Sequence, residues 1–241
     1  MPPLRVAAFQ RHPRFDDVAG IGKTLLQDLE WADAKDVDLA VFPECYLQGY
    51  AIDRSTIERR ALALDDMVLA GLLKRLGGIR ATVILGMIER RGDAFYNSAL
   101  TIKGGVLTGV YSKAHPNEQG FEPGTQFPVF EAASWPFGVN ICNDANFPET
   151  AGRIANNGAR LICYPLNNML KPETAARWRG KSVENLRAIA TQTGCWVASA
   201  DVVGDHAGLT SYGCTLIVRP DGEIAARATE LCEGVAIFDL L

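Results

Sequence analysis

Cys142 is the residue whose surroundings point most directly to chemistry. An apolar run, residues 137–142, ends at the cysteine, a polar turn follows, and Pro148-Glu149 open a helix-like stretch. A thiol between a strand's end and a helix's N-terminus lies near the positive end of the backbone dipoles, which lowers its pKa and favours the nucleophilic thiolate. Cysteine is also a small hydrophobe that packs in cores. This segment alone leaves both interpretations open.

Glu44 and Lys113 occupy comparable positions. Glu44 closes the apolar run of residues 39–44, and Lys113 follows the strand-like residues 107–112. Taken singly, the first is typical of a capping or surface carboxylate and the second of a solvated charge. In layered α/β folds, however, strand ends face the crevice where ligands bind. A carboxylate, an ammonium and a thiol at three strand ends therefore predict one shared site.

The composition excludes several classes of protein. The chain has 241 residues, of which 48% are apolar and 22% charged, as in an ordinary globular protein, and residues 1–241 are expected to form one domain. The net charge of -4 gives no basis for nucleic-acid binding or for attraction to an anionic membrane. No apolar segment is long enough to span a bilayer, and the N-terminus lacks the apolar core of a signal peptide. A cytoplasmic location is predicted.

The cysteines do not suggest a disulfide framework. All six are scattered without close pairing, and most lie in apolar strand-like runs, so they are expected to be reduced intracellular thiols. The sequence has no motif with the spacing of a zinc site, and neither a metal nor a cofactor is expected. The six positions are Cys45, Cys142, Cys163, Cys195, Cys214 and Cys232.

The pattern of apolar residues predicts helices and strands in alternation. Helices are expected at residues 17–35, 55–76, 148–157 and 173–193. Strands are expected at residues 4–10, 38–44, 127–131, 137–142, 160–165, 195–203, 212–219, 223–229 and 234–240. Residues 81–111 are also rich in strand patterns, with turn residues at 91–93 and 104–105 typical of tight hairpins. Helix–strand alternation interrupted by hairpins predicts an α/β layered domain with mixed sheets.

Three ordered blocks of sequence resemble the signatures of the nitrilase superfamily, the carbon–nitrogen hydrolases with a Glu-Lys-Cys triad. The blocks are Phe42-Pro43-Glu44 with Gly49-Tyr50, then residues 111–115, then residues 141–144 with Phe147-Pro148-Glu149. Supporting context comes from Tyr96-Asn97-Ser98, Glu122-Pro123-Gly124 and Pro220-Asp221-Gly222. The resemblance runs over nearly the whole chain. It implies a four-layer α-β-β-α sandwich with two mixed β-sheets.

The resemblance also implies catalytic roles. Cys142 would attack an amide carbonyl and form a thioester, and Glu44 would serve as general base. Lys113, together with the backbone N–H of Asn143, would hold the oxyanion. The family often carries a second glutamate after the lysine, for which Glu118 is the candidate and Glu122 the competitor.

The residues after the nucleophile narrow the substrate class. Nitrile-hydrolysing members typically have Cys-Trp-Glu, whereas Asn143-Asp144 resembles the amidase and carbamoylase branches. Many of those have an arginine next, which in N-carbamoyl-amino-acid hydrolases grips the substrate carboxylate. Ala145 and Asn146 take those places here, which favours a neutral or weakly polar small amide. An anchor for a substrate carboxylate would have to come from Arg153, Arg177 or Arg179. The residues expected to line the substrate pocket are Tyr50, Asn143, Phe147, Tyr164 and Asn167.

Several alternatives stay open. The same thioester would serve an N-carbamoyl-amino-acid amidohydrolase or an acyltransferase, and the fold would also suit a non-catalytic binding protein. His115 is expected to support the site and not to form a Cys-His pair. The helix around Trp178 and Arg187 resembles the region that family members use for two-fold contacts, which predicts a homodimer, although a helix packed on its own sheet fits as well.

Overall fold

The computed structural model describes residues 2–241, in which most strands form two six-stranded sheets. The first, in the order β14-β1-β2-β3-β4-β5, comprises β1 (Leu4–Gln10), β2 (Leu39–Val41), β3 (Thr82–Arg91), β4 (Ala94–Lys103), β5 (Val106–Ser112) and β14 (Gly234–Leu240). The second, in the order β13-β12-β9-β8-β7-β6, comprises β6 (Phe130–Ala132), β7 (Trp135–Val139), β8 (Leu161–Pro165), β9 (Trp196–Ala200), β12 (Leu216–Val218) and β13 (Ile224–Arg227). A separate hairpin is formed by β10 (Gly204–His206) and β11 (Leu209–Ser211).

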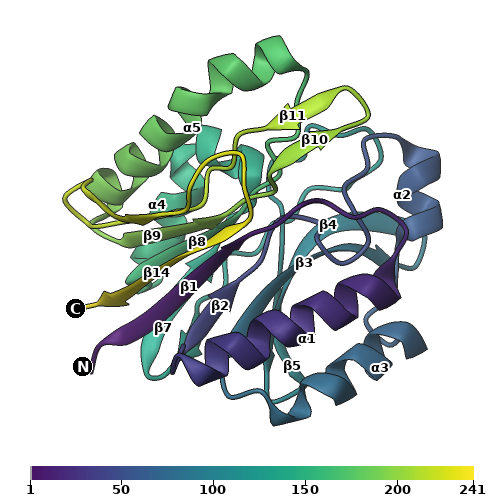
Figure 1. Cartoon of the computed structure of the whole chain (residues 1–241), viewed down its shortest axis with the longest axis horizontal. Helices are drawn as coiled ribbons and strands as arrows, with labels where there is room; N and C mark the ends of the chain where they lie inside the picture. Colours follow the sequence, from purple (N-terminus) through teal and green to yellow (C-terminus); the bar gives the residue numbers. More distant parts are fainter. Residues whose placement is uncertain (1) are drawn as a thin grey trace.

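Helices cover the outer face of each sheet. Figure 1 shows α1 and α3 against the first sheet and α4 and α5 against the second. The helices are α1 (Val18–Ala34), α2 (Arg54–Arg60), α3 (Met67–Arg75), α4 (Pro148–Asn156) and α5 (Pro172–Thr193), with short 3-10 turns η1 (Leu76–Gly78) and η2 (Cys142–Asn146). This arrangement confirms the predicted α-β-β-α sandwich with mixed sheets. Within residues 2–241, each helix is too short or too polar to cross a bilayer.

Strand alternation builds the layers. In β2, Leu39 and Val41 enter the core between the sheets, whereas Ala40 faces the core beneath α1 and α3. In β8, Cys163 faces the same inter-sheet core, and Ile162 faces α4 and α5. Because successive strand side chains point to opposite faces, both faces of these strands are apolar and read as continuous hydrophobic runs.

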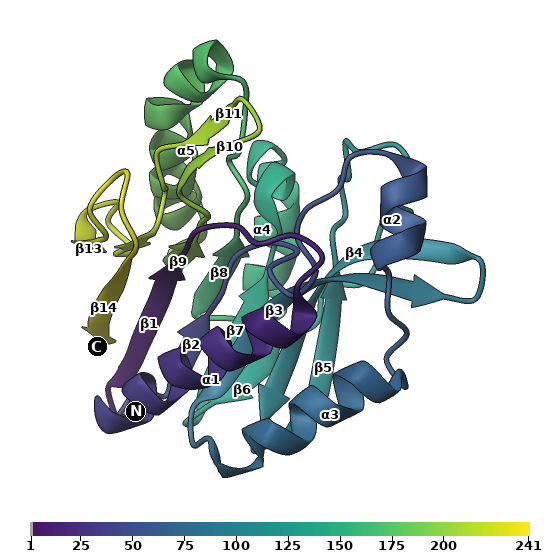
Figure 2. The same cartoon turned by 45° about the vertical axis from the view of Figure 1, so that its right-hand side comes forward.

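The parallel strands at the centre of each sheet bring their carboxyl ends together. β1, β2 and β3 are parallel, and so are β7, β8 and β9. β5 runs in the same direction as β3, because each of them pairs antiparallel with β4. The two sheets are joined at this edge, where the backbone N–H of Glu44 donates to the carbonyl of Leu166 at 3.2 Å. Figure 2 shows the two sheets side by side between their helices.

The single helix expected over residues 55–76 is wrong. The structure has α2 and α3 instead, separated by an extended segment in which Leu62 pairs with Glu89 at the edge of β3. The side chains of Asp53 and Asp66 cap the two helices, accepting from the backbone N–H groups of Thr56 and Val68. Asp66 was thus a helix start signal inside the apparently continuous pattern.

Two catalytic candidates lie beyond their strands, not within them. β2 ends at Val41, so Glu44 belongs to the following turn, and Pro43 has no N–H to extend the ladder. β7 ends at Val139, and Cys142 begins the turn η2. Both expected strands were therefore too long at their carboxyl ends. The short β10–β11 hairpin was not expected at all.

Two glycines permit close backbone approaches beside Glu44 and Lys113. A Cβ on Gly86 of β3 would lie 2.3 Å from the carbonyl oxygen of Pro43 and 2.5 Å from the nitrogen of Cys45. A Cβ on Gly124 would lie 2.1 Å from the carbonyl oxygen of Ser112, which precedes Lys113. Neither position has room for a side chain.

We expect Gly86→Ala to lower the free energy of unfolding by about 1–3 kcal/mol, because the added methyl overpacks the backbone next to Glu44. Urea denaturation measures the change. Gly71→Ala is the matched control: a Cβ there meets nothing within 4 Å, and the residue lies inside α3. That variant should gain about 0.5–1 kcal/mol from helix propensity. Equal stability of the two variants would contradict the packing argument.

Candidate active site

Lys113 lies between two carboxylates in the interior of the molecule. Its Nζ donates to Oε1 of Glu44 and to Oε1 of Glu118, each at 2.8 Å. Lys113 and Glu44 are each 1% exposed, and Glu118 is 8% exposed. Glu122, the competing candidate, is exposed, so the structure places Glu118 against the lysine. The turn after β2, the end of β5 and the loop after β5 bring these three charges together.

Further side chains hold the two carboxylates in place. Asn97 of β4 donates from Nδ2 to Oε1 of Glu44 at 2.7 Å, and its Oδ1 accepts from the thiol of Cys45 at 3.4 Å. The hydroxyl of Tyr50 donates to Oε1 of Glu118. Among the described residues, Oε2 of Glu44 has no hydrogen-bond partner. Glu44 therefore has one oxygen fixed by two donors and one oxygen free to take up a proton.

Cys142 occupies a strained turn that Asp144 pins down. Its φ of 42° lies in the left-handed region, which costs a non-glycine residue about 1–3 kcal/mol. The carboxylate of Asp144 accepts the backbone N–H groups of Ile141 and His115, each at 2.9 Å, and the hydroxyl of Tyr111 at 2.8 Å. These bonds hold the turn in the conformation that presents the thiol.

A buried polar network supports the turn from below. Asn140 donates to the hydroxyl of Tyr111 at 3.0 Å and accepts from the hydroxyls of Tyr164 at 3.0 Å and Thr150 at 3.1 Å. Tyr164 is fully buried in β8 and faces this network. The expectation that Tyr164 lines the pocket is therefore wrong, because Tyr164 instead supports the turn that carries the thiol.

The pKa values of the two glutamates beside Lys113 are shifted in opposite directions. Burial raises the pKa of Glu44 to about 7, with the like charge of Glu118 adding to the effect and the attraction of Lys113 opposing it. Burial would also raise the pKa of Glu118, but the charge of Lys113 and the hydrogen bonds from Lys113 and Tyr50 outweigh it and lower that pKa. Burial likewise disfavours the ammonium, yet the neighbouring negative charges raise the pKa of Lys113. Of these three groups, Glu44 is thus the one whose pKa lies nearest to neutral pH.

The thiol is not activated in the way the sequence suggested. Burial, with the charge of Glu44 adding to it, raises the pKa of Cys142 well above its ordinary value, and the opposing effects of Lys113 and of the backbone N–H of Asn167 are smaller. The expectation of a lowered thiol pKa at the helix N-terminus is therefore wrong. A hydrogen bond joins Lys113 to Glu44, and the charges of both residues affect the pKa of Cys142 in opposite directions.

A cavity of about 290 Å³ lies at Cys142. Tyr50 and Asn143 are in its wall, as expected, and one face of α5 supplies a side of it. Asn167 lines an adjoining cavity of about 780 Å³ that shares Tyr50. Phe147 is not in the wall of the first cavity, because its ring stacks on the imidazole of His115 with centroids 3.8 Å apart. Two of the five residues that were expected to line the pocket therefore lie in the wall of the cavity at Cys142.

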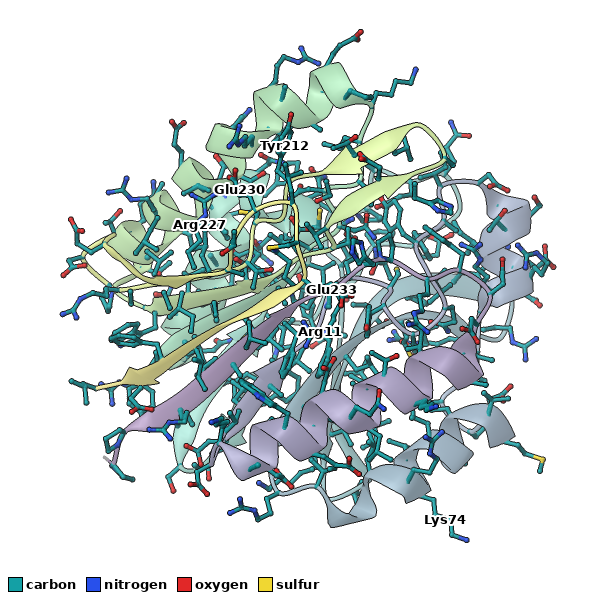
Figure 3. The ribbon with its side chains drawn as sticks, viewed as in Figure 1. Arg11, Lys74, Tyr212, Arg227, Glu230 and Glu233 are labelled. Atoms are coloured by element: carbon teal, nitrogen blue, oxygen red, sulfur yellow. The ribbon has the colours of Figure 1, made fainter. Side chains whose placement is uncertain are left out.

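The three arginines considered as carboxylate anchors do not line the cavity at Cys142. Arg153 lies in a different surface hollow, and Arg177 is exposed. Arg179 pairs with Glu230, which also pairs with Arg227 at 2.5 Å. Figure 3 shows Arg227, at the end of β13, and Glu230, in the turn that follows, beside α5. Within residues 2–241, the cavity therefore has no arginine in place for a substrate carboxylate.

Asp201, which was not among the expected site residues, anchors the cavity wall. Its fully buried carboxylate accepts the backbone N–H of Asn168 at 3.0 Å, the side-chain amide of Asn168 at 2.8 Å, and the backbone N–H groups of Val202 and Cys214, each at 2.9 Å. Burial raises the pKa of Asp201 to about 6. A signal was present, because Asp201 directly follows the apolar strand β9.

Comparison with known proteins assigns the class. The family model described as carbon-nitrogen hydrolase matches residues 5–240, so the chain belongs to the carbon–nitrogen hydrolase family. A nitrilase of Pyrococcus abyssi is 30% identical over 217 residues, which cover 87% of this chain and 79% of that protein. A hydrolase from the pqqF 5' region of Pseudomonas protegens is 33% identical over 232 residues, which cover 93% of this chain and 79% of that protein. An (R)-stereoselective amidase of Pseudomonas sp. is 32% identical over 202 residues, covering 81% of this chain and 70% of the amidase.

The fold is shared with a solved member of the superfamily. The structure of Saccharomyces cerevisiae Nit3, a member of branch 10 of the nitrilase superfamily, matches with a TM-score of 0.85 at 21% identity. The match covers 99% of this chain and 90% of Nit3. The predictions of the superfamily and of an enzyme of the carbon–nitrogen hydrolase class are confirmed.

We expect Asn97→Ser to move the acidic limb of the pH–rate profile toward higher pH. Glu44 must be ionised to accept a proton, so activity is lost as the pH falls through the pKa of Glu44, about 7. Removing the amide donor of Asn97 disfavours the carboxylate form and raises that pKa further. The measurement is kcat/KM for amide hydrolysis over a pH series spanning neutrality. Asn157→Ser, at an exposed asparagine, should leave the limb in place; a shift toward lower pH in Asn97→Ser would contradict the assignment.

Proposed function

We propose that the protein hydrolyses a non-peptide C–N bond in a small linear amide through a thioester on Cys142. The observation that carries this proposal is the geometry of the buried Glu44, which has one oxygen fixed by Lys113 and Asn97 and the other without a hydrogen-bond partner among the described residues. Burial raises the pKa of Glu44 to about 7. A base with a pKa near the working pH is best suited to move protons during catalysis. A thiol of raised pKa needs such a base before it can attack.

In the first half of the reaction, Glu44 accepts the thiol proton as the sulfur of Cys142 attacks the carbonyl carbon. The oxygen of the tetrahedral species gains negative charge and is held by the ammonium of Lys113 and the backbone N–H of Asn143. Glu44 then passes its proton to the nitrogen, the C–N bond breaks, and ammonia or an amine leaves. The acyl group remains on the sulfur as a thioester.

In the second half, water attacks the thioester carbonyl. Glu44 accepts a proton from the water, and the same two donors hold the second oxyanion. The C–S bond then breaks, the carboxylic acid leaves, and the sulfur of Cys142 recovers the proton from Glu44. Glu118 and Tyr50 keep Lys113 in position throughout, because they provide the second anion and its hydrogen bond.

The amide substrate is supported from two sides. A relative that covers most of the chain is an amidase, and the cavity at Cys142 is small and has no arginine for the carboxylate of an N-carbamoyl amino acid. Residues 1–241 would form a single catalytic domain. The homodimer and the cytoplasmic location that the sequence predicted stay predictions.

We expect Cys142→Ala to lower ammonia release from short aliphatic amides by more than about 1,000-fold, because the covalent route is lost. Cys232→Ala is the matched control, since Cys232 is an exposed thiol and its loss should not change the rate. Added hydroxylamine should trap the thioester as a hydroxamate in the unmodified protein only. Equal ammonia release from the protein and from Cys142→Ala would refute the mechanism.

A further inference from the structure

Three asparagines form a connected row of side-chain amides along the cavity at Cys142. Asn185 of α5 donates from Nδ2 to Oδ1 of Asn146 at 2.9 Å, and Asn146 donates from Nδ2 to Oδ1 of Asn143 at 3.0 Å. Asn143 in turn donates to the backbone carbonyl of His115 at 2.8 Å. All three asparagines are in the cavity wall. We call these three residues the asparagine row.

The hydrogen bonds within the asparagine row fix the orientation of its three side-chain amides. Asn185 and Asn146 each use one N–H of Nδ2 for the next member of the row, and Asn143 uses one for the carbonyl of His115. Each Nδ2 therefore retains a second N–H, and each side-chain carbonyl retains a lone pair. The row begins at Asn143, whose backbone N–H is the proposed oxyanion donor. It ends on α5, which supplies a different side of the cavity. A substrate held at the thiol would therefore meet neutral donors and acceptors along its acyl chain.

The rest of the wall is equally free of charge. Asn117 and Asn168 add two further amides, and Ser182 adds a hydroxyl. Among the described residues, no aspartate, glutamate, lysine, arginine or histidine lines this cavity. Held against these described residues, an ionic group on the acyl chain would find no opposite charge in the wall. An uncharged polar group would instead find hydrogen-bond partners.

We propose that the asparagine row selects acyl chains that are uncharged and end in a hydrogen-bonding group, such as the second amide of a short diamide. This inference rests on the proposed function for the reacting end of the substrate. Asn146 is its central specificity residue, since it both donates and accepts within the row. The chemistry recognised is that of a neutral carboxamide or hydroxyl at the far end of the chain.

Three amides of similar length test the selection. Glutaramide is neutral, glutaramate carries a carboxylate, and 5-aminopentanamide carries an ammonium at the far end. We expect kcat/KM for glutaramide to exceed that for either charged amide by at least about tenfold. Equal or better hydrolysis of a charged amide would overturn the inference.

The variant Asn146→Asp places one negative charge in the row at nearly the same size. We expect it to shift the ratio of kcat/KM for 5-aminopentanamide over glutaramide upward by at least about tenfold. The matched control is Asn157→Asp, which adds the same charge at an exposed residue whose amide also donates a single hydrogen bond, to the carbonyl of Phe127 at 2.9 Å. The control should leave the ratio unchanged, and an equal shift in both variants would show a general charge effect and refute the role of Asn146.

A binding measurement separates this inference from the proposed function. Cys142→Ala cannot form the thioester, so its thermal unfolding can be followed with each amide present and unreacted. We expect glutaramide to raise the Tm and the two charged amides to raise it much less. Selective binding without any hydrolysis by the unmodified protein would refute the proposed function and support the inference. No rise with glutaramide, or a larger rise with a charged amide, would refute the inference.

Discussion

One buried ammonium shared by two carboxylates is the interaction on which the rest of the structure depends. Removing charges from water is expensive, and only close, well-aligned partners offset that cost. Lys113 meets this condition through Glu44 and Glu118, both at 2.8 Å. Burial raises the pKa of Glu44, the more deeply buried carboxylate, to about 7; the attraction of Lys113 opposes this effect and the like charge of Glu118 adds to it.

Apolar clusters fill the space between the sheets and beneath the helices, and a polar edge remains where the strands end. The strands bury apolar side chains on both faces, and their carboxyl ends deliver the ionisable groups to the seam between the two sheets. Gly86 and Gly124 let the backbone approach closely on either side of the ion cluster. Asp144 and Asp201, both fully buried, pin the turn that bears the thiol and the wall of the cavity. The reactive groups are therefore rigidly placed before a substrate arrives.

Strand periodicity predicted an α/β layered domain with mixed sheets, and the family resemblance implied the four layers. The strand-end positions predicted one shared site for Glu44, Lys113 and Cys142, of which the structure joins Lys113 to Glu44 by a hydrogen bond. The sequence did not predict the break between α2 and α3, where tertiary pairing of Leu62 with the edge of β3 overrides a continuous helical pattern. The raised pKa of the Cys142 thiol could not be predicted from the sequence either, because desolvation depends on what the rest of the chain places around the sulfur. The position of Tyr164 was predicted wrongly for the same kind of reason, since the partner of its hydroxyl comes from a distant segment of the chain, and its ring packs in the cluster beneath α4 and α5.

The central claim is that burial beside the Lys113–Glu118 pair makes Glu44 the group that titrates near neutral pH. Infrared difference titration of the protein against Glu44→Gln measures this directly, through the carbonyl band of a protonated carboxylic acid. The account predicts a band that grows as the pH falls through about 7 and is missing from the variant. A band that develops only near the ordinary pKa of glutamate, or that persists unchanged in Glu44→Gln, would contradict it.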